Sequence, residues 1–108
     1  MTPQEIQERN EQIALMLGYV NTSPTDKDFN IFEYPTKIGE IPKMIETMSM
    51  KFHSDWNWLH EAVNKVFSLL TPSDSRKHDI IQLLGRNQKE ATFIAVSDFA
   101  KLYNEKKL

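Results

Sequence analysis

The sequence predicts an α+β domain that is predominantly helical, with about four helices and a small two-stranded β element. Three observations support this fold class. Capping residues precede several stretches with helical apolar periodicity, residues 29–52 contain two short strand-like segments, and 108 residues suffice for one domain with a modest core. We therefore expect residues 1–108 to form a single domain.

The first predicted helix covers residues 3–17. Thr2 and Glu5 form a capping box, with Pro3 at the first helical position, and Gly18 follows as a stop. Asn10 lies on the apolar face and makes it narrow, so we expect this helix to lie on the surface of the domain. The apolar residues of that face are Ile6, Ile13, Ala14 and Leu17.

The β element is expected within residues 29–52. Residues 29–34 (FNIFEY) are rich in strand formers and end at Pro35. Residues 47–52 (TMSMKF) alternate polar and apolar side chains, as a half-buried strand does. Between them, residues 42–45 are compatible with a helical turn. The pairing of the two strands is left open.

The second predicted helix covers residues 55–70. Ser54 is expected to cap it, Asp55 suits the positive end of the helix dipole, and Thr71 with Pro72 ends it. Its apolar residues fall within one broad arc, with a second ridge along the edge. The arc holds Trp56, Leu59, Val63, Val66, Phe67 and Leu70, and the ridge holds Trp58, Ala62 and Leu69.

Two further helices are predicted, over residues 74–84 and 88–104. The first has good start residues in Asp74 and Ser75 and a stop at Gly85, although a short strand through residues 79–83 is the competing interpretation. The last begins near Asn87, and its apolar arc is so wide that it needs more than one neighbour. We therefore expect it to lie centrally and to pack on the second helix. Its arc comprises Ala91, Phe93, Ala95, Val96, Phe99, Ala100, Leu102 and Tyr103.

Composition excludes several classes of protein. Thirteen basic and 15 acidic residues give a formal charge of −2, which provides no general attraction to nucleic acid or anionic membrane. The absence of cysteine excludes disulfides, thiolate metal sites and cysteine nucleophiles. No apolar run approaches the roughly 18 residues of a membrane span, and the N-terminus lacks a signal segment, so we expect a soluble cytoplasmic protein.

The residues that could carry chemistry do not form a recognisable constellation. Residues 53–61 (HSDWNWLHE) bring two histidines and two carboxylates together, but His53 and His60 are seven positions apart, which is not a ligand pair on a helix. The serines lack the glycine-flanked elbow of an activated nucleophile. We therefore predict no catalytic residue, metal or cofactor, and expect that the protein is not an enzyme.

Aromatic residues provide the best candidates for an interaction surface. Tyr19 and the aromatic residues of segment 29–34 are expected mainly to form a second layer of the core. Trp58 is equally compatible with the edge of the core and with a contact to a protein partner or a second copy of the chain. The predicted interaction surface consists of Phe32, Tyr34, Trp58 and His60.

Residues 53–59 (HSDWNWL) and 61–66 (EAVNKV) resemble a block found in short uncharacterised proteins of Bacteroidetes and their phages. Residues 13–19 (IALMLGY) are similar to a second block of that family. Residues 95–106 resemble its closing helix, which carries an aromatic-Ile-Lys-Trp-Tyr-Asn pattern, although this chain has Leu102 where tryptophan is usual. The resemblance implies a bacterial or prophage accessory protein and identifies no catalytic residue.

Three functions follow from these patterns, and the first is favoured. It is a small non-enzymatic binding or accessory module. The second is a nucleic-acid-associated regulator, and the third is a metal-dependent or hydrolytic enzyme that uses His53, His60 and acidic residues from the strands. For the regulator, four basic residues would have to converge around the third helix: Arg76, Lys77, Arg86 and Lys89.

Overall fold

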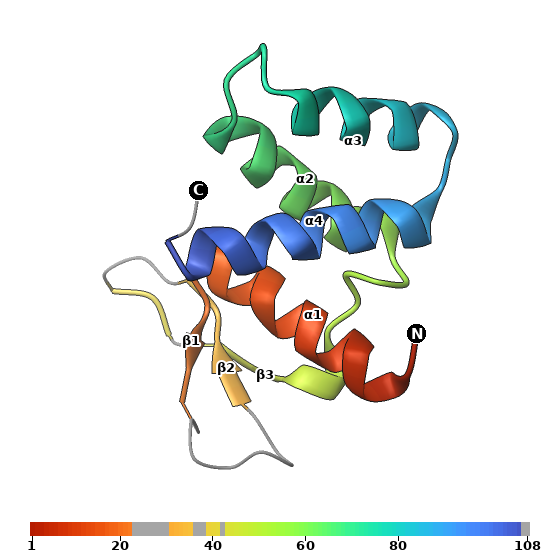
Figure 1. Cartoon of the computed structure of the whole chain (residues 1–108). Helices are drawn as coiled ribbons and strands as arrows, with labels where there is room; N and C mark the ends of the chain where they lie inside the picture. The colour runs from red at the N-terminus through yellow and green to blue at the C-terminus, as the bar shows by residue number, and fades with distance from the viewer. Residues whose placement is uncertain (23–30, 36–38, 42, 107–108) are drawn as a thin grey trace.

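Four α-helices and a small antiparallel sheet make up the part of the chain that the computed structural model describes, residues 1–22, 31–35, 39–41 and 43–106. This confirms the α+β, predominantly helical prediction (Figure 1). The helices begin and end within a residue or two of their predicted bounds. In chain order the elements are α1 (Pro3–Met16), β1 (Val20–Asn21), β2 (Ile31–Glu33), β3 (Met44–Glu46), the 3-10 helix η1 (Thr47–Ser49), α2 (Trp56–Leu69), α3 (Ser75–Gly85) and α4 (Lys89–Asn104).

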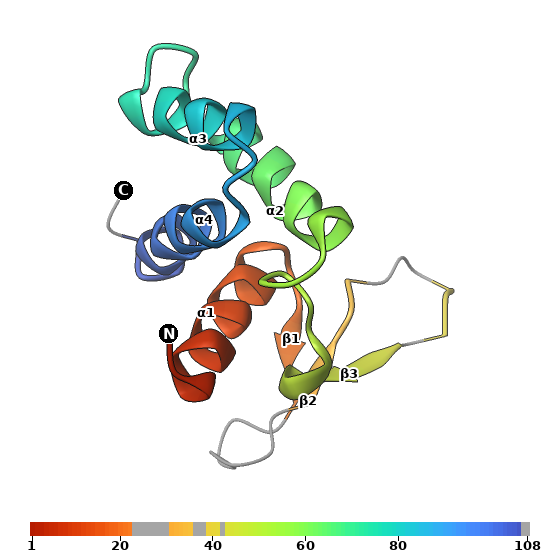
Figure 2. The same cartoon turned by 90° about the vertical axis from the view of Figure 1, so that its right-hand side faces the viewer.

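Helix α4 contacts all three other helices, as its wide apolar arc predicts. Figure 2 shows α4 between α3 on one side and α1 on the other, with α2 beside it. Phe93, Val96 and Ala100 are completely buried, and Phe99 is 4% exposed. Burial of each large side chain contributes about 2 kcal/mol, so this helix organises the core.

Helix α1 lies at the surface as predicted, with Gln4, Glu8 and Leu15 exposed, but its inner face is packed more extensively than its narrow apolar stripe suggests. Its contact with α4 is the most extensive between any two helices of the described residues, and Ile13 and Ala14 are fully buried. Asn10 is buried as well, at 2% exposed, with its amide nitrogen 3.1 Å from His53 Nδ1. Thr2 caps the helix as expected, its hydroxyl accepting from the Glu5 N–H at 3.1 Å.

The starts of α2 and α4 differ slightly from those predicted. Asp55, not Ser54, caps α2, and its carboxylate accepts from the Asn57 N–H at 2.8 Å. The N–H groups of Ser54 and Asp55 both donate to the Lys51 carbonyl, so the turn before the helix extends to Asp55 and α2 begins after it. Helix α4 begins at Lys89, since Asn87 has a left-handed φ of +54° that no helix accommodates.

The sheet has three strands rather than the two predicted. All pairs are antiparallel in the order β1-β2-β3, with Val20 opposite Glu33 and Phe32 opposite Ile45. Strand β1 lies outside residues 29–52, β3 forms where a helical turn was expected, and η1 forms where a strand was expected. Phe29, Asn30 and Pro42, which belonged to the predicted β element, lie outside the described residues.

The apolar alternation of residues 47–52 has a different physical cause from strand pairing. Met50 and Phe52 are buried at 1% and 0% exposed, whereas Met48 is 76% exposed. The backbone is extended at Met50, after the turn of η1, so alternate side chains point inward without a neighbouring strand. Apolar alternation indicates which side chains are buried, whereas a strand is defined by its backbone hydrogen bonds to a neighbouring strand.

Phe32 is 1% exposed in the central strand, so its truncation tests the core. Phe32→Ala should lower the free energy of unfolding by about 3–5 kcal/mol, since it leaves a cavity under the sheet. Met48→Ala, at an exposed position, should change it by less than about 0.5 kcal/mol. Urea denaturation followed by circular dichroism measures both. Equal effects of the two substitutions would contradict the observed burial.

Candidate functional site

The four residues of the predicted interaction surface do not lie together in the structure. Tyr34 and Trp58 line one pocket. Phe32 does not belong to a surface, because it points inward from β2 and is buried; the prediction for this residue is wrong. His60 lies elsewhere, with its ring 5.4 Å from that of Trp56. Two residues along a helix rotate a side chain by about 200°, so Trp58 and His60 cannot share one face.

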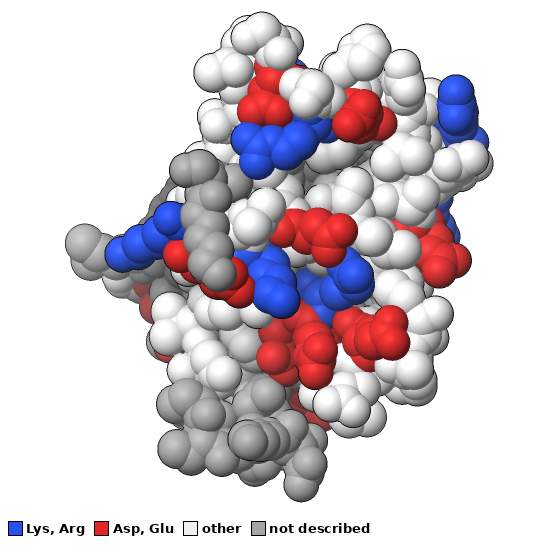
Figure 3. All heavy atoms as spheres, in the orientation of Figure 1, with Lys and Arg blue, Asp and Glu red and all other residues white. Residues whose placement is uncertain are grey.

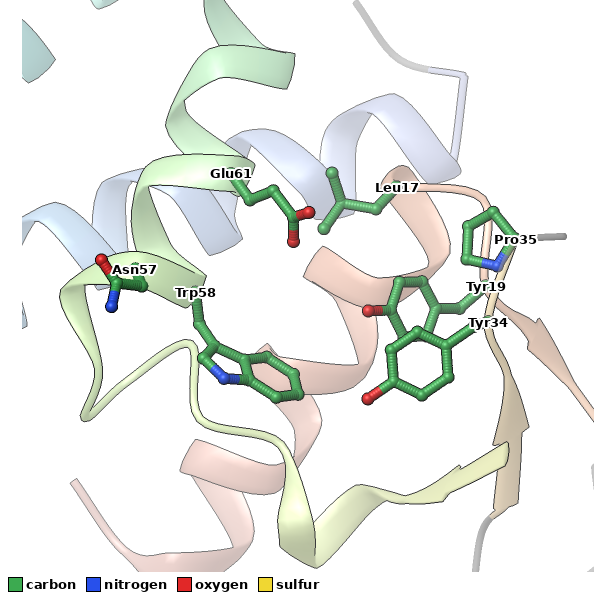
Figure 4. A pocket seen from close by; sticks show the side chains of 7 residues that line it. All are labelled: Leu17, Tyr19, Tyr34, Pro35, Asn57, Trp58 and Glu61. Atoms are coloured by element: carbon green, nitrogen blue, oxygen red, sulfur yellow. The ribbon is translucent and has the colours of Figure 1, made fainter. Parts of the chain in front are cut away.

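The pocket that contains Tyr34 and Trp58 has a volume of about 540 Å³. Figure 4 shows the tyrosines and Pro35 on one side, Trp58 and Asn57 on the other, and the Glu61 side chain between them. Such a size suits a small organic group or one long side chain. We call it the aromatic pocket, and the described residues that line it are Leu17, Tyr19, Tyr34, Pro35, Asn57, Trp58 and Glu61.

The end of α1 positions Tyr19. The Gly18 N–H bonds to the Leu15 carbonyl and the Tyr19 N–H to the Ala14 carbonyl, at 3.1 and 2.9 Å. With Gly18 at φ +96°, this is a Schellman motif, which reverses the chain and directs the next side chain back toward the helix. The Gly-Tyr pair after an apolar helix was the signal that could have placed Tyr19 here.

Phe52 fixes the relative positions of the aromatic rings. It is completely buried, and its centroid lies 5.1 Å from Trp58 and 6.5 Å from Tyr19, edge-on to both. Tyr34 packs on Tyr19 with centroids 4.8 Å apart. Edge-to-face and tilted contacts are the favoured geometries of aromatic pairs. Four aromatic rings thus form one continuous cluster; they come from the turn after α1, the position after β2, the loop before α2, and α2 itself.

Glu61 provides the only formal charge among the described residues that line the aromatic pocket. Sequence reasoning did not select it, although it follows Trp58 by three positions and therefore lies on the same helix face. Burial and then the charge of Glu61 raise the pKa of Tyr34. Burial, Tyr34 and Glu61 raise the pKa of Tyr19. Both hydroxyls therefore remain neutral at ordinary pH.

The two histidines of residues 53–61 lie in separate surroundings. His53 Nδ1 is 3.1 Å from the Asn10 amide nitrogen, and its ring is 6.0 Å from that of Phe93. His60 instead contacts Trp56, which is half-buried at the edge of the core. Within residues 1–22, 31–35, 39–41 and 43–106, no three histidine, aspartate or glutamate side chains are arranged to hold a metal ion.

The basic residues around α3 do not converge. Arg76 and Arg86 are at opposite ends of the helix, about 15 Å apart along its axis. Arg76 forms an ion pair with Asp74 at 2.8 Å, Lys77 lies over the Phe67 ring, and Lys89 donates to the Ser54 carbonyl. Figure 3 shows basic and acidic side chains intermixed over α1 and α4. This distribution does not favour the nucleic-acid hypothesis.

The chain matches no protein-family model, no curated protein and no solved structure. Among the described helices, none has both the length and the apolar character needed to cross a membrane.

Glycine at position 18 is required by its left-handed backbone, not by lack of space, because an added Cβ would meet Pro35 at an ordinary 3.6 Å. Gly18→Ala should lower the free energy of unfolding by about 1 kcal/mol. Gly85→Ala is the matched control: Gly85 is helical with nothing within 4 Å of an added Cβ, so this substitution should stabilise the protein by about 0.5 kcal/mol. Thermal denaturation of both variants shows whether each substitution lowers or raises the stability of the protein.

Burial lowers the pKa of His53 below its ordinary 6.5. Below pH 6.5 the unfolded chain therefore takes up a proton more readily than the folded protein does. The free energy of unfolding should fall as the pH drops from 6.5 toward the lowered pKa of the folded state, then level off for this group. His53→Gln should reduce this slope. Urea denaturation between pH 5 and 7.5 measures it, and an unchanged slope in His53→Gln would contradict the assignment.

Proposed function

We propose that this protein is a non-enzymatic binding module and that the aromatic pocket is its recognition site. The observation that carries the proposal is that Tyr34 and Trp58, both half-buried, line one hollow with Tyr19, over the buried ring of Phe52. Partly exposed aromatic side chains held rigidly beside a few polar groups are typical of specific binding sites. The occupant is supplied by a partner molecule.

The rigidity of the rings supports recognition over a purely structural role. An aromatic residue that serves only the core contributes most to stability when it is completely buried. Tyr34 and Trp58, however, each remain partly exposed to solvent. Their packing on Tyr19 and Phe52 limits the side-chain entropy that a ligand would otherwise have to remove. A prebuilt pocket of this kind binds with little rearrangement.

The resemblance of residues 53–66 to short proteins of Bacteroidetes and their phages supports an accessory role in a bacterial or prophage setting. Within that setting the partner of the aromatic pocket is a cytoplasmic protein or a small molecule attached to one. Trp58 and Glu61, which lie within the resembling block, also line the pocket.

A pull-down from native bacterial lysate with matched variants tests the proposal. Wild-type protein should retain a specific partner, and Tyr34→Ala should weaken retention by about 30-fold, the effect of losing a hot-spot aromatic worth about 2 kcal/mol. His60→Ala is the control, since His60 is exposed on the same helix but outside the pocket. It should bind like the wild type.

Circular dichroism establishes first that each variant is folded. Retention of the same partner by Tyr34→Ala at wild-type strength would place recognition elsewhere on the molecule. Failure of the wild type to retain any macromolecule would count against a protein-binding role.

A further inference from the structure

The chemistry of the aromatic pocket indicates the kind of ligand that it accepts. Three of its walls are aromatic rings, those of Tyr19, Tyr34 and Trp58. The face of an aromatic ring carries partial negative charge and attracts cations within about 6 Å of its centre, most strongly for tryptophan and tyrosine. Rings on several sides of one cavity therefore add their attraction for a positively charged group.

The rings are arranged as walls and not as a flat stack. Tyr19 and Tyr34 meet at 42°, which makes a concave corner, and Trp58 stands on the other side of the pocket (Figure 4). Phe52 meets Trp58 at 82° and Tyr19 at 70°, so its buried ring braces both walls from behind. The separation of the walls is therefore fixed before a ligand arrives.

Glu61 gives the pocket a negative charge. Its carboxylate points toward the tyrosine side of the pocket in Figure 4, and no hydrogen bond or ion pair to it is present among the described residues. The neighbouring hydroxyls of Tyr19 and Tyr34 stay neutral beside it. A cationic ligand would meet complementary charge, and an anionic ligand would be repelled.

We propose that the aromatic pocket binds a methylated ammonium group on an alkyl stem. The head group lies against the rings of Tyr19, Tyr34 and Trp58 with its charge balanced by Glu61, and the stem lies along Leu17 and Pro35. This inference rests on the proposed binding function and specifies its ligand class.

Other cations fit the pocket less well. A hard metal ion requires several oxygen ligands, and Glu61 is the only carboxylate among the described lining residues. A primary ammonium is compact and strongly hydrated, so aromatic walls replace its water poorly. Methylation removes N–H donors that the rings could not satisfy and adds apolar surface, which Leu17 and Pro35 can cover.

The test compares choline with its neutral isostere 3,3-dimethyl-1-butanol, in which carbon replaces the charged nitrogen. Each is titrated into the ¹⁵N-labelled full chain and followed by NMR. The indole N–H of Trp58 should shift on addition of choline, while that of Trp56, outside the pocket beside His60, serves as an internal control. Choline should bind about 5- to 30-fold more tightly than the alcohol.

Two variants test which side chains cause the preference for choline over the neutral alcohol. Glu61→Gln should reduce the affinity for choline several-fold and leave that for the neutral alcohol unchanged, because only the charge is removed. Tyr34→Leu keeps apolar volume but removes a π face, so it should reduce the ratio between the two affinities. His60→Gln, outside the pocket, should leave both affinities at their wild-type values.

A second titration identifies the source of the head group. A short peptide containing trimethyl-lysine is compared with the same peptide containing unmodified lysine. Tighter binding of the methylated peptide than of choline assigns the pocket to a modified protein side chain, and equal binding assigns it to the head group alone. Either result supports the proposal.

Equal affinity for choline and the neutral alcohol would overturn the cation proposal while leaving an apolar binding pocket in place. Absence of any shift at Trp58 with choline and with the methylated peptide would also overturn it. The pull-down with Tyr34→Ala decides the binding-module proposal independently, since it does not assume what the ligand is.

Discussion

The burial of α4 among three helices is the contact on which the rest of the structure depends. Phe93, Val96 and Ala100 are fully enclosed, and each adjoining helix covers a different part of the apolar arc. Polar contacts fix the register of α1 on α4 at two points: Arg9 bonds to Ser97 and Asp98, and the Asn104 amide donates to the Gln12 carbonyl. Apolar burial supplies the stability, and these directional bonds select one arrangement.

The aromatic pocket is a consequence of that arrangement. Because α1 is fixed against α4, its C-terminal Schellman turn delivers Tyr19 and the first strand to a set position. The loop before α2 is fixed in turn by Phe52, which is buried against the same tyrosine. A pocket built on helix and strand ends that are anchored in the core keeps its shape, and recognition by flat aromatic faces depends on that shape.

Local signals predicted much of the fold because they act over few residues. The caps of α1 and α3, Thr2 and Asp74, each accept from an N–H two or three positions later. Strand identity was predicted poorly for the opposite reason. Met44–Glu46 becomes β3 only because β2 lies beside it, and neither residue type nor periodicity carries that pairing. The two-residue β1 is likewise too short to leave a pattern.

The sequence by itself determined the helices and their ends to within a residue or two, the apolar arc that makes α4 central, and the selection of Tyr34 and Trp58 as candidate contacts. The tertiary structure alone decided that Phe32 is buried, that His60 faces away, and that Tyr19 and Glu61 join the other two in one pocket. The physical reason is the separation along the chain of the residues that interact. Caps and helical faces follow from bonds between near neighbours, whereas a pocket is formed by packing of segments that are distant along the chain.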